Sequence, residues 1–212
     1  MQNSGTKNFL RRYTELPYLI DYLSTGEIYL PSPKSWDDRN DSFYLEQYAK
    51  IKGLNDTYAL CLTDAYETYH HWKVFSSGPS GVCIVFDREK FLKAIQQVPD
   101  LKAEPVEYKT IKEMRGREIE TKILPFLKRY PFRDEEEFRL FAAPITQQRS
   151  GYRVSIPLST ISNISLSPWT PKNVVKNVRI LLKSIKGCSK IKIWGSTLIE
   201  NEEWKTFSAK RT

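Results

Sequence analysis

The sequence predicts one α+β domain over residues 1–212. Short strands and helices follow one another irregularly, and this pattern favours α+β over a doubly wound sheet. The chain contains neither G-x-G-x-x-G nor a P-loop, so a Rossmann or P-loop enzyme is not expected. No internal repeat, low-complexity tract or linker divides it. We therefore expect a single domain with one core.

The chain opens with a predicted strand, helix and strand. Residues 9–13 favour a strand, and residues 15–23 place apolar side chains at helical spacing. Thr14 is the expected N-cap of that helix, and Gly26 is expected to end it. The strand at 27–30 then stops at prolines.

The remaining elements follow from periodicity and from turn residues. A polar loop is expected at residues 35–42. Helices are expected at residues 43–51, 64–75, 88–98, 111–130 and 174–185. Strands are expected at residues 58–63, 82–86, 105–108, 138–142, 152–156, 161–166 and 190–193.

Cysteine usage and hydropathy indicate a cytoplasmic protein. The cysteines are far apart and form no C-x-x-C pair, which favours buried thiols in a reducing compartment over zinc or disulfides. The first residues are polar and lack the apolar run of a signal peptide. No stretch approaches the roughly 18 apolar residues of a membrane helix. The three cysteines are Cys61, Cys83 and Cys188.

Positive charge is concentrated at the C-terminal end. The net charge is +8, and residues 172–212 carry ten basic residues against three acidic ones. A one-sided basic field favours a polyanionic partner, and nucleic acid is the expected one. The alternative is a solvated, lysine-rich helix face that keeps the protein soluble.

The acidic segment Glu135–Arg139 stands at the start of a predicted strand. Residues two apart in a strand point to the same side, so Glu135 and Glu137 should share a face and Glu136 should point away. Two carboxylates on one face raise one pKa, bind a sugar hydroxyl and stabilise positive charge on a neighbouring carbon. The alternative is an exposed strand start whose acids pair with nearby arginines, Arg133 and Arg139.

Two earlier segments fit the same chemistry. Arg11 and Arg12 lie on the first strand, where a guanidinium can hold a phosphate with two hydrogen bonds. Thr63 ends a middle strand with a hydroxyl group. An arginine, a hydroxyl residue and a late E-x-E resemble the order in R-S-E ADP-ribosyltransferases, with Thr63 in place of the usual serine.

That resemblance implies NAD as a substrate and a role for each residue. Arg11 or Arg12 would hold the NAD phosphates, and Thr63 would orient Glu137. Glu137 would bond the nicotinamide ribose, while Glu135 would position or deprotonate the acceptor. The rings of Tyr13 and Trp72 would stack on the nicotinamide or on a target base.

A broader resemblance covers most of the chain. The ordered motifs resemble the bacterial domain-of-unknown-function family 2971, although Ser42 stands where that family has proline and Phe75 where tyrosine is common. The two ends are also similar to nucleic-acid ADP-ribosyltransferases of the DarT type. This implies split antiparallel sheets with peripheral helices. The motifs lie at residues 13–33, 36–43, 72–75, 81–87, 106–108, 135–139, 164–168 and 196–199.

Together these features predict an NAD-dependent ADP-ribosyltransferase that modifies DNA or RNA. Such an enzyme would act as a toxin or phage-defence effector, with a protein antitoxin or regulator as a further partner. One alternative is a non-catalytic nucleic-acid-binding or sensing module. Another is a metal-dependent nuclease that joins the aspartates at 37, 38 and 41 to Glu135 and Glu137. No metal site is predicted, because the adjacent His70 and His71 point different ways on a helix.

Overall fold

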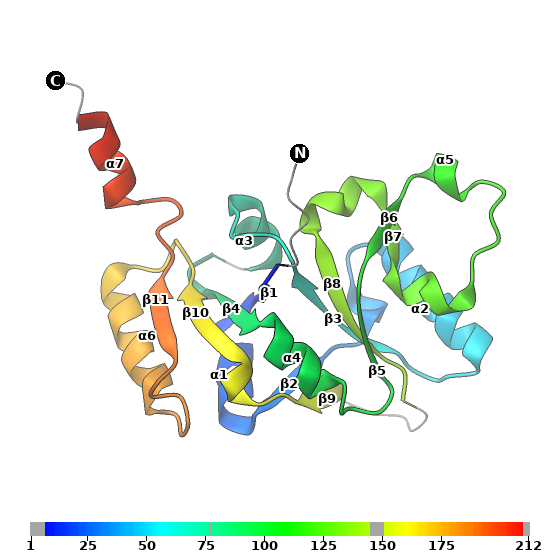
Figure 1. Ribbon diagram of the computed structural model, residues 1–212, viewed down its shortest axis with the longest axis horizontal. Helices are drawn as coiled ribbons and strands as arrows, with labels where there is room; N and C mark the ends of the chain where they lie inside the picture. Colours follow the sequence, from blue (N-terminus) through cyan, green and yellow to red (C-terminus); the bar gives the residue numbers. More distant parts are fainter. Residues whose placement is uncertain (1–6, 77, 145–150, 210–212) are drawn as a thin grey trace.

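The computed structural model describes residues 7–76, 78–144 and 151–209, and these form an α+β fold around one main sheet (Figure 1). The α+β prediction is therefore confirmed. Seven strands make up the main sheet in the described residues. In spatial order they are β11 (Lys192–Gly195), β10 (Ile161–Leu166), β4 (Gly81–Asp87), β1 (Phe9–Glu15), β3 (Tyr58–Thr63), β8 (Glu137–Ala142) and β5 (Leu101–Pro105).

The sheet consists of two well-paired blocks with a narrow junction between β1 and β3. Within the blocks, β1 pairs with β4 through seven residues and β3 pairs with β8 through six. Across the junction the only registered pair is Arg11 with Thr63. Apart from β10 and β11, which are parallel, all neighbouring strands are antiparallel. The expected split corresponds to the junction between β1 and β3. There, a single residue pair joins two blocks of one continuous sheet.

Two small sheets and seven helices surround the main sheet in the described residues. The small sheets pair β2 (Glu27–Leu30) with β9 (Tyr152–Ser155), and β6 (Glu107–Lys109) with β7 (Leu127–Arg129). The helices are α1 (Leu16–Thr25), α2 (Arg39–Lys52), α3 (Tyr69–Phe75), α4 (Arg88–Ile95), α5 (Ile111–Met114), α6 (Lys172–Ser184) and α7 (Glu202–Ala209).

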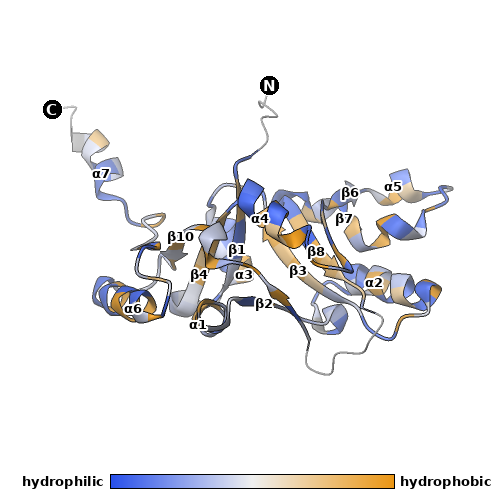
Figure 2. Cartoon of the chain, turned by 60° about the horizontal axis from the view of Figure 1, so that its bottom comes forward, coloured by the Kyte–Doolittle hydropathy of each residue, from blue (hydrophilic) through white to orange (hydrophobic). Residues whose placement is uncertain are grey.

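Helices cover both faces of the sheet. On one face, α1 and α4 pack with β2 and β9 over the largest apolar cluster. On the other face, α2 and α3 cover two smaller clusters. Strand β4 shows why: Val82, Ile84 and Phe86 belong to the first face, and Cys83 and Val85 to the second. Burial on both sides explains the uninterrupted apolar run that predicted a central strand. Hydrophobic colouring follows the inner strands in Figure 2.

Helix starts account for three corrections. Thr14 belongs to β1, and Glu15 occupies the N-cap position of α1 without a side-chain hydrogen bond. The expected loop at 35–42 ends early, because Asp38 accepts hydrogen bonds from two backbone N–H groups and starts α2 at Arg39. The helix expected from residue 64 begins only at Tyr69, where Thr68 caps it. Gly26 ends α1 in the left-handed conformation, as expected.

The helix expected over residues 111–130 is wrong. Residues 111–114 form the four-residue α5, residues 121–126 form a 3-10 helix, and β7 follows. Gly116 has a positive φ, and Pro125 lacks the N–H that a continuous helix needs. The backbone groups of β7 bond to β6 instead.

Three smaller differences concern the strands and the C-terminal end. The strand expected at 105–108 is two strands, β5 and β6, separated at Val106, whose N–H donates to the carbonyl oxygen of Glu137. The last strand lies at 192–195, two residues later than expected at either end. Helix α7 was not expected, and it extends away from the rest of the chain in Figure 1. No helix within the described residues is long and apolar enough to cross a membrane.

Candidate functional site

Arg11, Thr63 and Glu137 form a row across three neighbouring strands. Arg11 on β1 lies opposite Thr63 on β3, and Thr63 lies opposite Glu137 on β8. Directly opposed residues point to the same side of a sheet, so the three side chains share the face covered by α2 and α3. The row crosses the junction between the two blocks at its single registered pair.

The row lines a narrow cavity, and two larger hollows share residues with it. The row cavity, about 20 Å³, is lined by Arg11, Thr63 and Glu137, together with Arg12, Tyr13, Cys61, Leu62, Phe75 and Glu135. Arg12, Tyr13 and Phe75 also line a wider hollow of about 420 Å³ beside α3. A third hollow, about 190 Å³, shares Arg12. The row cavity is therefore a narrow recess next to larger spaces.

The hydroxyl of Thr63 acts on the backbone of the acidic segment. It donates to the carbonyl oxygen of Glu135 at 2.6 Å and accepts from the N–H of Ala65 at 2.9 Å. The Nε2 atom of His71 lies 3.1 Å from the same carbonyl and 3.3 Å from the Thr63 hydroxyl. No hydrogen bond joins Thr63 to the Glu137 carboxylate, so Thr63 holds the start of the segment in place.

His71 is a structural histidine on α3. Its Nδ1 atom lies 2.6 Å from the Thr68 hydroxyl, and its ring stacks on Tyr13 with centroids 5.5 Å apart. Burial lowers its pKa, although the carbonyl of Glu135 opposes this shift. The neutral ring therefore fastens α3 to the acidic segment.

The Glu137 carboxylate is buried and held by two cations. Arg139 donates to it from Nε at 2.7 Å and from Nη2 at 3.0 Å, and Lys128 donates from Nζ at 3.2 Å. Burial alone would raise the pKa of Glu137, but Arg139 and Lys128 outweigh it and lower that pKa to about 2. Glu137 is therefore an anion at any pH at which an enzyme would be assayed.

Arg139 is fully buried between the sheet and α2. Its Nη1 and Nη2 atoms donate to the two carboxylate oxygens of Asp41 at 2.8 and 2.6 Å, and Nη1 also donates to the carbonyl oxygen of Pro125 at 2.8 Å. The bidentate geometry satisfies the guanidinium, so this buried charge is fully compensated. Residues 41 and 139 thus join α2 to β8.

Lys128 gathers three carboxylates. Its Nζ atom lies 2.5 Å from Glu135, 3.2 Å from Glu137 and 3.6 Å from Asp41. Burial opposes a charge on Lys128, but the two glutamates outweigh it and raise its pKa. We call the five residues Asp41, Lys128, Glu135, Glu137 and Arg139 the ionic network.

The ionic network weakens the case for the nuclease alternative. Three of the five proposed acids do come together, but an ammonium and a guanidinium already neutralise them. Asp38 caps α2 instead of joining them. Among the described residues, no group of three or more His, Cys, Asp or Glu side chains is arranged to hold a metal ion.

The acidic segment differs in conformation from the expected strand. Glu135 ends a 3-10 helix, Glu136 is left-handed with φ 41°, and β8 begins at Glu137. The phenol oxygen of Tyr108 accepts from the N–H of Glu137 at 2.8 Å and helps to fix the strand start. The two outer carboxylates still converge on Lys128, while Glu136 pairs with Lys7 near the surface. The prediction that Glu136 faces away from both is confirmed.

The two arginines have different surroundings. The Nη1 atom of Arg11 donates to the carbonyl oxygen of Ala65 at 2.9 Å, and its guanidinium lies over the Tyr66 ring at 5.4 Å. The Nη1 atom of Arg12 donates to the carbonyl oxygen of Cys61 at 3.0 Å, and burial lowers the pKa of Arg12. Neither arginine makes an ion pair with a carboxylate in the part of the chain that the structure describes.

The two predicted stacking rings also differ. Tyr13 lines the row cavity, and its buried hydroxyl has no hydrogen-bond partner among the described residues. Trp72 is fully buried behind Tyr13, with ring centroids 5.0 Å apart, and its indole N–H donates to Glu67 at 2.8 Å. Trp72 lines none of the three hollows, so it is a core residue and not a stacking surface.

Sequence reasoning missed three contributors to the site and placed a fourth, Asp41, only in the nuclease alternative. Asp41 was expected in a loop, Lys128 in a long helix, and Tyr108 on a strand without a role. His71 was considered only as a metal ligand. For Arg139, the expected pairing with an acid is present, but it is buried rather than exposed. Only the apolar residues around Arg139 hinted at its burial.

The basic helix α6 lies away from the row. Helix α6 packs on β11, which forms the opposite edge of the sheet from β8 and β5 (Figure 1). Strands β10 and β4 separate β11 from β1. Four of the ten basic residues lie on α6: Lys172, Lys176, Arg179 and Lys183.

The fold and site define an α+β protein with a charged row at a sheet junction. No protein-family model matches the chain, and no curated protein matches it. Two solved structures of DarT from Thermus sp. 2.9 are similar. The complex with ADP-ribosylated ssDNA gives a TM-score of 0.46 at 11% identity, covering 92% of this chain and 97% of that one. The complex with NAD+ gives 0.44 at 10% identity, covering 91% and 96%.

Proposed function

We propose that this chain is an ADP-ribosyltransferase that uses NAD as its substrate and transfers ADP-ribose to a nucleic acid. The carrying observation is the row of Arg11, Thr63 and Glu137 at the junction of the sheet, where the three side chains line one cavity. The chemistry requires an anion at the reacting sugar, and Glu137 is a buried anion that lines this cavity.

Glu137 is the proposed catalytic residue. A carboxylate offers about four lone-pair sites, and Arg139 and Lys128 fill three of them with charge-assisted bonds. The weakly donating thiol of Cys61 is the remaining neighbour. A ribose hydroxyl of NAD would displace that thiol and bond to Glu137. The carboxylate would then stabilise the oxocarbenium-like ribose as its C1′–N bond breaks and nicotinamide leaves with the bonding electrons.

Arg12 is the proposed phosphate ligand. Its guanidinium is desolvated, Arg12 lines all three hollows, and it has no ion-pair partner among the described residues. A diphosphate would supply the missing anion with paired hydrogen bonds. Arg11, whose guanidinium rests on Tyr66, would border the sugar.

Glu135 is proposed to receive the acceptor's proton. Burial raises its pKa above the ordinary value, although Lys128 opposes this, and a raised pKa strengthens a carboxylate as a base. As the acceptor atom bonds to C1′, its proton would pass to Glu135.

The hollows suit this division of the substrate. The row cavity admits a group of about one water in size, so only the hydroxyl edge of the ribose would enter it. The adjoining hollow of about 420 Å³ falls within the roughly 300–1,000 Å³ of ligand pockets and would receive the rest of NAD.

Nucleic acid is the proposed acceptor because of the basic field. Residues 172–212 carry ten basic and three acidic residues, and the α6 lysines and arginine would attract a phosphate backbone. Binding of this kind weakens steeply as salt rises, so acceptor labelling should fall with ionic strength.

The decisive experiment incubates the protein with labelled NAD and separate DNA, RNA and protein fractions, and measures nicotinamide release. We expect label in a nucleic-acid fraction. Glu137→Gln should reduce nicotinamide release by about 10²–10³-fold, because a neutral amide stabilises the cationic sugar poorly.

Two comparisons separate catalysis from folding. Glu136→Gln changes a neighbouring acid that pairs near the surface and should keep wild-type turnover. Arg12→Lys should raise KM for NAD more than it lowers kcat, because an ammonium cannot make the bidentate contact. Wild-type nicotinamide release by a folded Glu137→Gln protein would overturn the proposal. Label confined to the protein fraction would overturn the acceptor assignment.

A further inference from the structure

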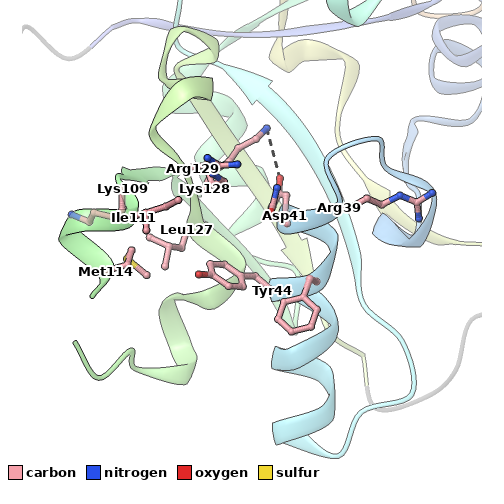
Figure 3. Close-up of a pocket in the computed structure, with 11 residues that line it drawn as sticks. Arg39, Asp41, Tyr44, Lys109, Ile111, Met114, Leu127, Lys128 and Arg129 are labelled. Carbon is pink, nitrogen blue, oxygen red and sulfur yellow. Dashed lines mark ion pairs between the residues drawn. The ribbon is translucent and has the colours of Figure 1, made fainter. Parts of the chain in front are cut away.

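A second cavity lies on the other side of the ionic network. It measures about 610 Å³ and opens between α2 on one side and β6, α5 and β7 on the other (Figure 3). It shares no lining residue with the row cavity. Asp41 and Lys128 line it, while Glu135 and Glu137 line the row cavity, so the ionic network separates the two. We call it the cationic-rim pocket.

The walls of the cationic-rim pocket are largely apolar. Tyr44 projects from α2 toward the opposite wall, which carries Ile111, Met114 and Leu127 (Figure 3). Phe43 adds a second, exposed ring on the α2 side. An aromatic ring beside aliphatic and thioether groups is a suitable surface for a flat heterocycle.

Basic side chains surround these apolar walls, and two of them are available to a ligand. Arg129 is exposed and makes no ion pair within residues 7–76, 78–144 and 151–209. Lys109 lies 3.1 Å from Glu107, a solvent-exposed partner that an anion could replace at little cost. Lys128 is engaged by the network, and Arg39, at the start of α2, points away from the other lining side chains (Figure 3). The acidic lining residue, Asp41, is neutralised by Arg139.

We propose that the cationic-rim pocket binds a nucleoside phosphate. The base would stack on Tyr44 against Ile111 and Met114, and the phosphate would lie between Lys109 and Arg129. An aromatic heterocycle with an attached anion matches apolar walls with a basic edge better than either part alone. The same chemistry serves a free mononucleotide or one nucleotide of a single strand.

This site does not rest on the proposed transferase activity. It uses residues that the row does not use, and it would bind its ligand even if NAD were never cleaved. Direct binding measurements therefore test it without an assay of turnover.

The test measures calorimetric affinity of the full chain for AMP, adenosine, inorganic phosphate and an eight-nucleotide single strand. We expect AMP to bind at least about tenfold more tightly than adenosine or phosphate, because it makes both contacts. A single strand that binds more tightly than AMP, and loses that affinity when Lys109 and Arg129 are replaced, assigns the site to nucleic acid. Tighter binding of AMP assigns it to free nucleotides.

Matched variants locate the binding. Lys109→Gln with Arg129→Gln should weaken AMP about tenfold or more. Lys176→Gln with Arg179→Gln removes the same charge from α6 and should leave AMP affinity unchanged. Tyr44→Leu keeps apolar volume but removes the ring, so it should weaken AMP and spare phosphate.

Three outcomes would overturn the proposal. AMP and the single strand could both fail to bind, the pocket and α6 variants could weaken AMP equally, or Tyr44→Leu could have no effect. Circular dichroism of each variant confirms folding. Arg129 is exposed and Lys109 pairs with the exposed Glu107, so a folding failure is not expected.

Discussion

The two cavities on either side of the ionic network differ in almost every physical respect. The row cavity is narrow, buried and lined by charged groups from the central strands. The cationic-rim pocket is about thirty times larger and has apolar walls with basic residues around them. Lys128 and Asp41 line the cationic-rim pocket and are also members of the ionic network, in which Lys128 contacts Glu137 of the row.

The buried charges of the ionic network stabilise one another across the boundary between the two cavities. Glu137 gains its low pKa from Arg139 and Lys128, and Arg139 in turn depends on Asp41. The pocket side of the network therefore supports the carboxylate on the row side. Variants of the network should cost most, and variants outside it least.

The largest expected effect is that of Arg139→Met. Removing the guanidinium leaves Asp41 and Glu137 buried with a single remaining ammonium, so the free energy of unfolding should fall by about 3–5 kcal/mol. Urea denaturation measures it. Arg133→Met is the control, because Arg133 is half exposed and should change the unfolding free energy by about 1 kcal/mol or less. Equal losses of unfolding free energy in the two variants would show that the ionic network stabilises the fold no more than an exposed ion pair does.

The pH dependence of stability tests the lowered pKa of Glu137, which lines the row cavity. Its folded pKa of about 2 lies below its ordinary value of 4.5, so its stabilising contribution is complete above pH 4.5 and is lost as pH falls toward 2. The contribution is about 3 kcal/mol. Urea midpoints between pH 5.5 and 2.5 should therefore fall more steeply for the wild type than for Glu137→Gln. Parallel profiles would contradict the lowered pKa.

Thr63→Val tests the hydroxyl in the middle of the row. The valine keeps the shape but leaves the Ala65 N–H without its acceptor, so the unfolding free energy should fall by about 1–3 kcal/mol. Thr63→Ser keeps the hydroxyl and should retain more stability, as thermal denaturation of both variants would show. Indistinguishable variants would mean that the bonds to Glu135 and Ala65 do not stabilise the row.

Local sequence patterns predicted the central strands well. The apolar run at 82–86 and the alternation at 58–63 reflect burial that each strand experiences on its own. The region 111–130 failed because pairing between β6 and β7 overrides its helical pattern. Helix α2 began early because the hydrogen bonds of Asp38 fix its first turn.

The row and the ionic network were predictable to different degrees. The order of an arginine, a threonine and a glutamate on three predicted strands brought these residues together through its resemblance to the R-S-E order. Their adjacency across β1, β3 and β8 is visible only in the structure. Lys128 could not be assigned, since it meets Glu137 only through a contact between elements that are not paired in the sequence pattern. Asp41 was joined to Glu137 only in the nuclease alternative, and its ion pair with Arg139 was not foreseen. Trp72 was misread because a large ring gives no local sign of whether it lines a cavity or fills a core.

The smallest expected effect belongs to Glu136, which lies beside the network without joining it. Its carboxylate pairs with Lys7 near the surface, so Glu136→Gln should change the unfolding free energy by less than about 1 kcal/mol. Its φ of 41° is a backbone conformation that glycine adopts without strain, so Glu136→Gly should be equal to or more stable than Glu136→Gln. Thermal denaturation ranks the two. A loss of several kcal/mol in Glu136→Gln, comparable to that of Arg139→Met, would mean that the boundary of the network is drawn in the wrong place.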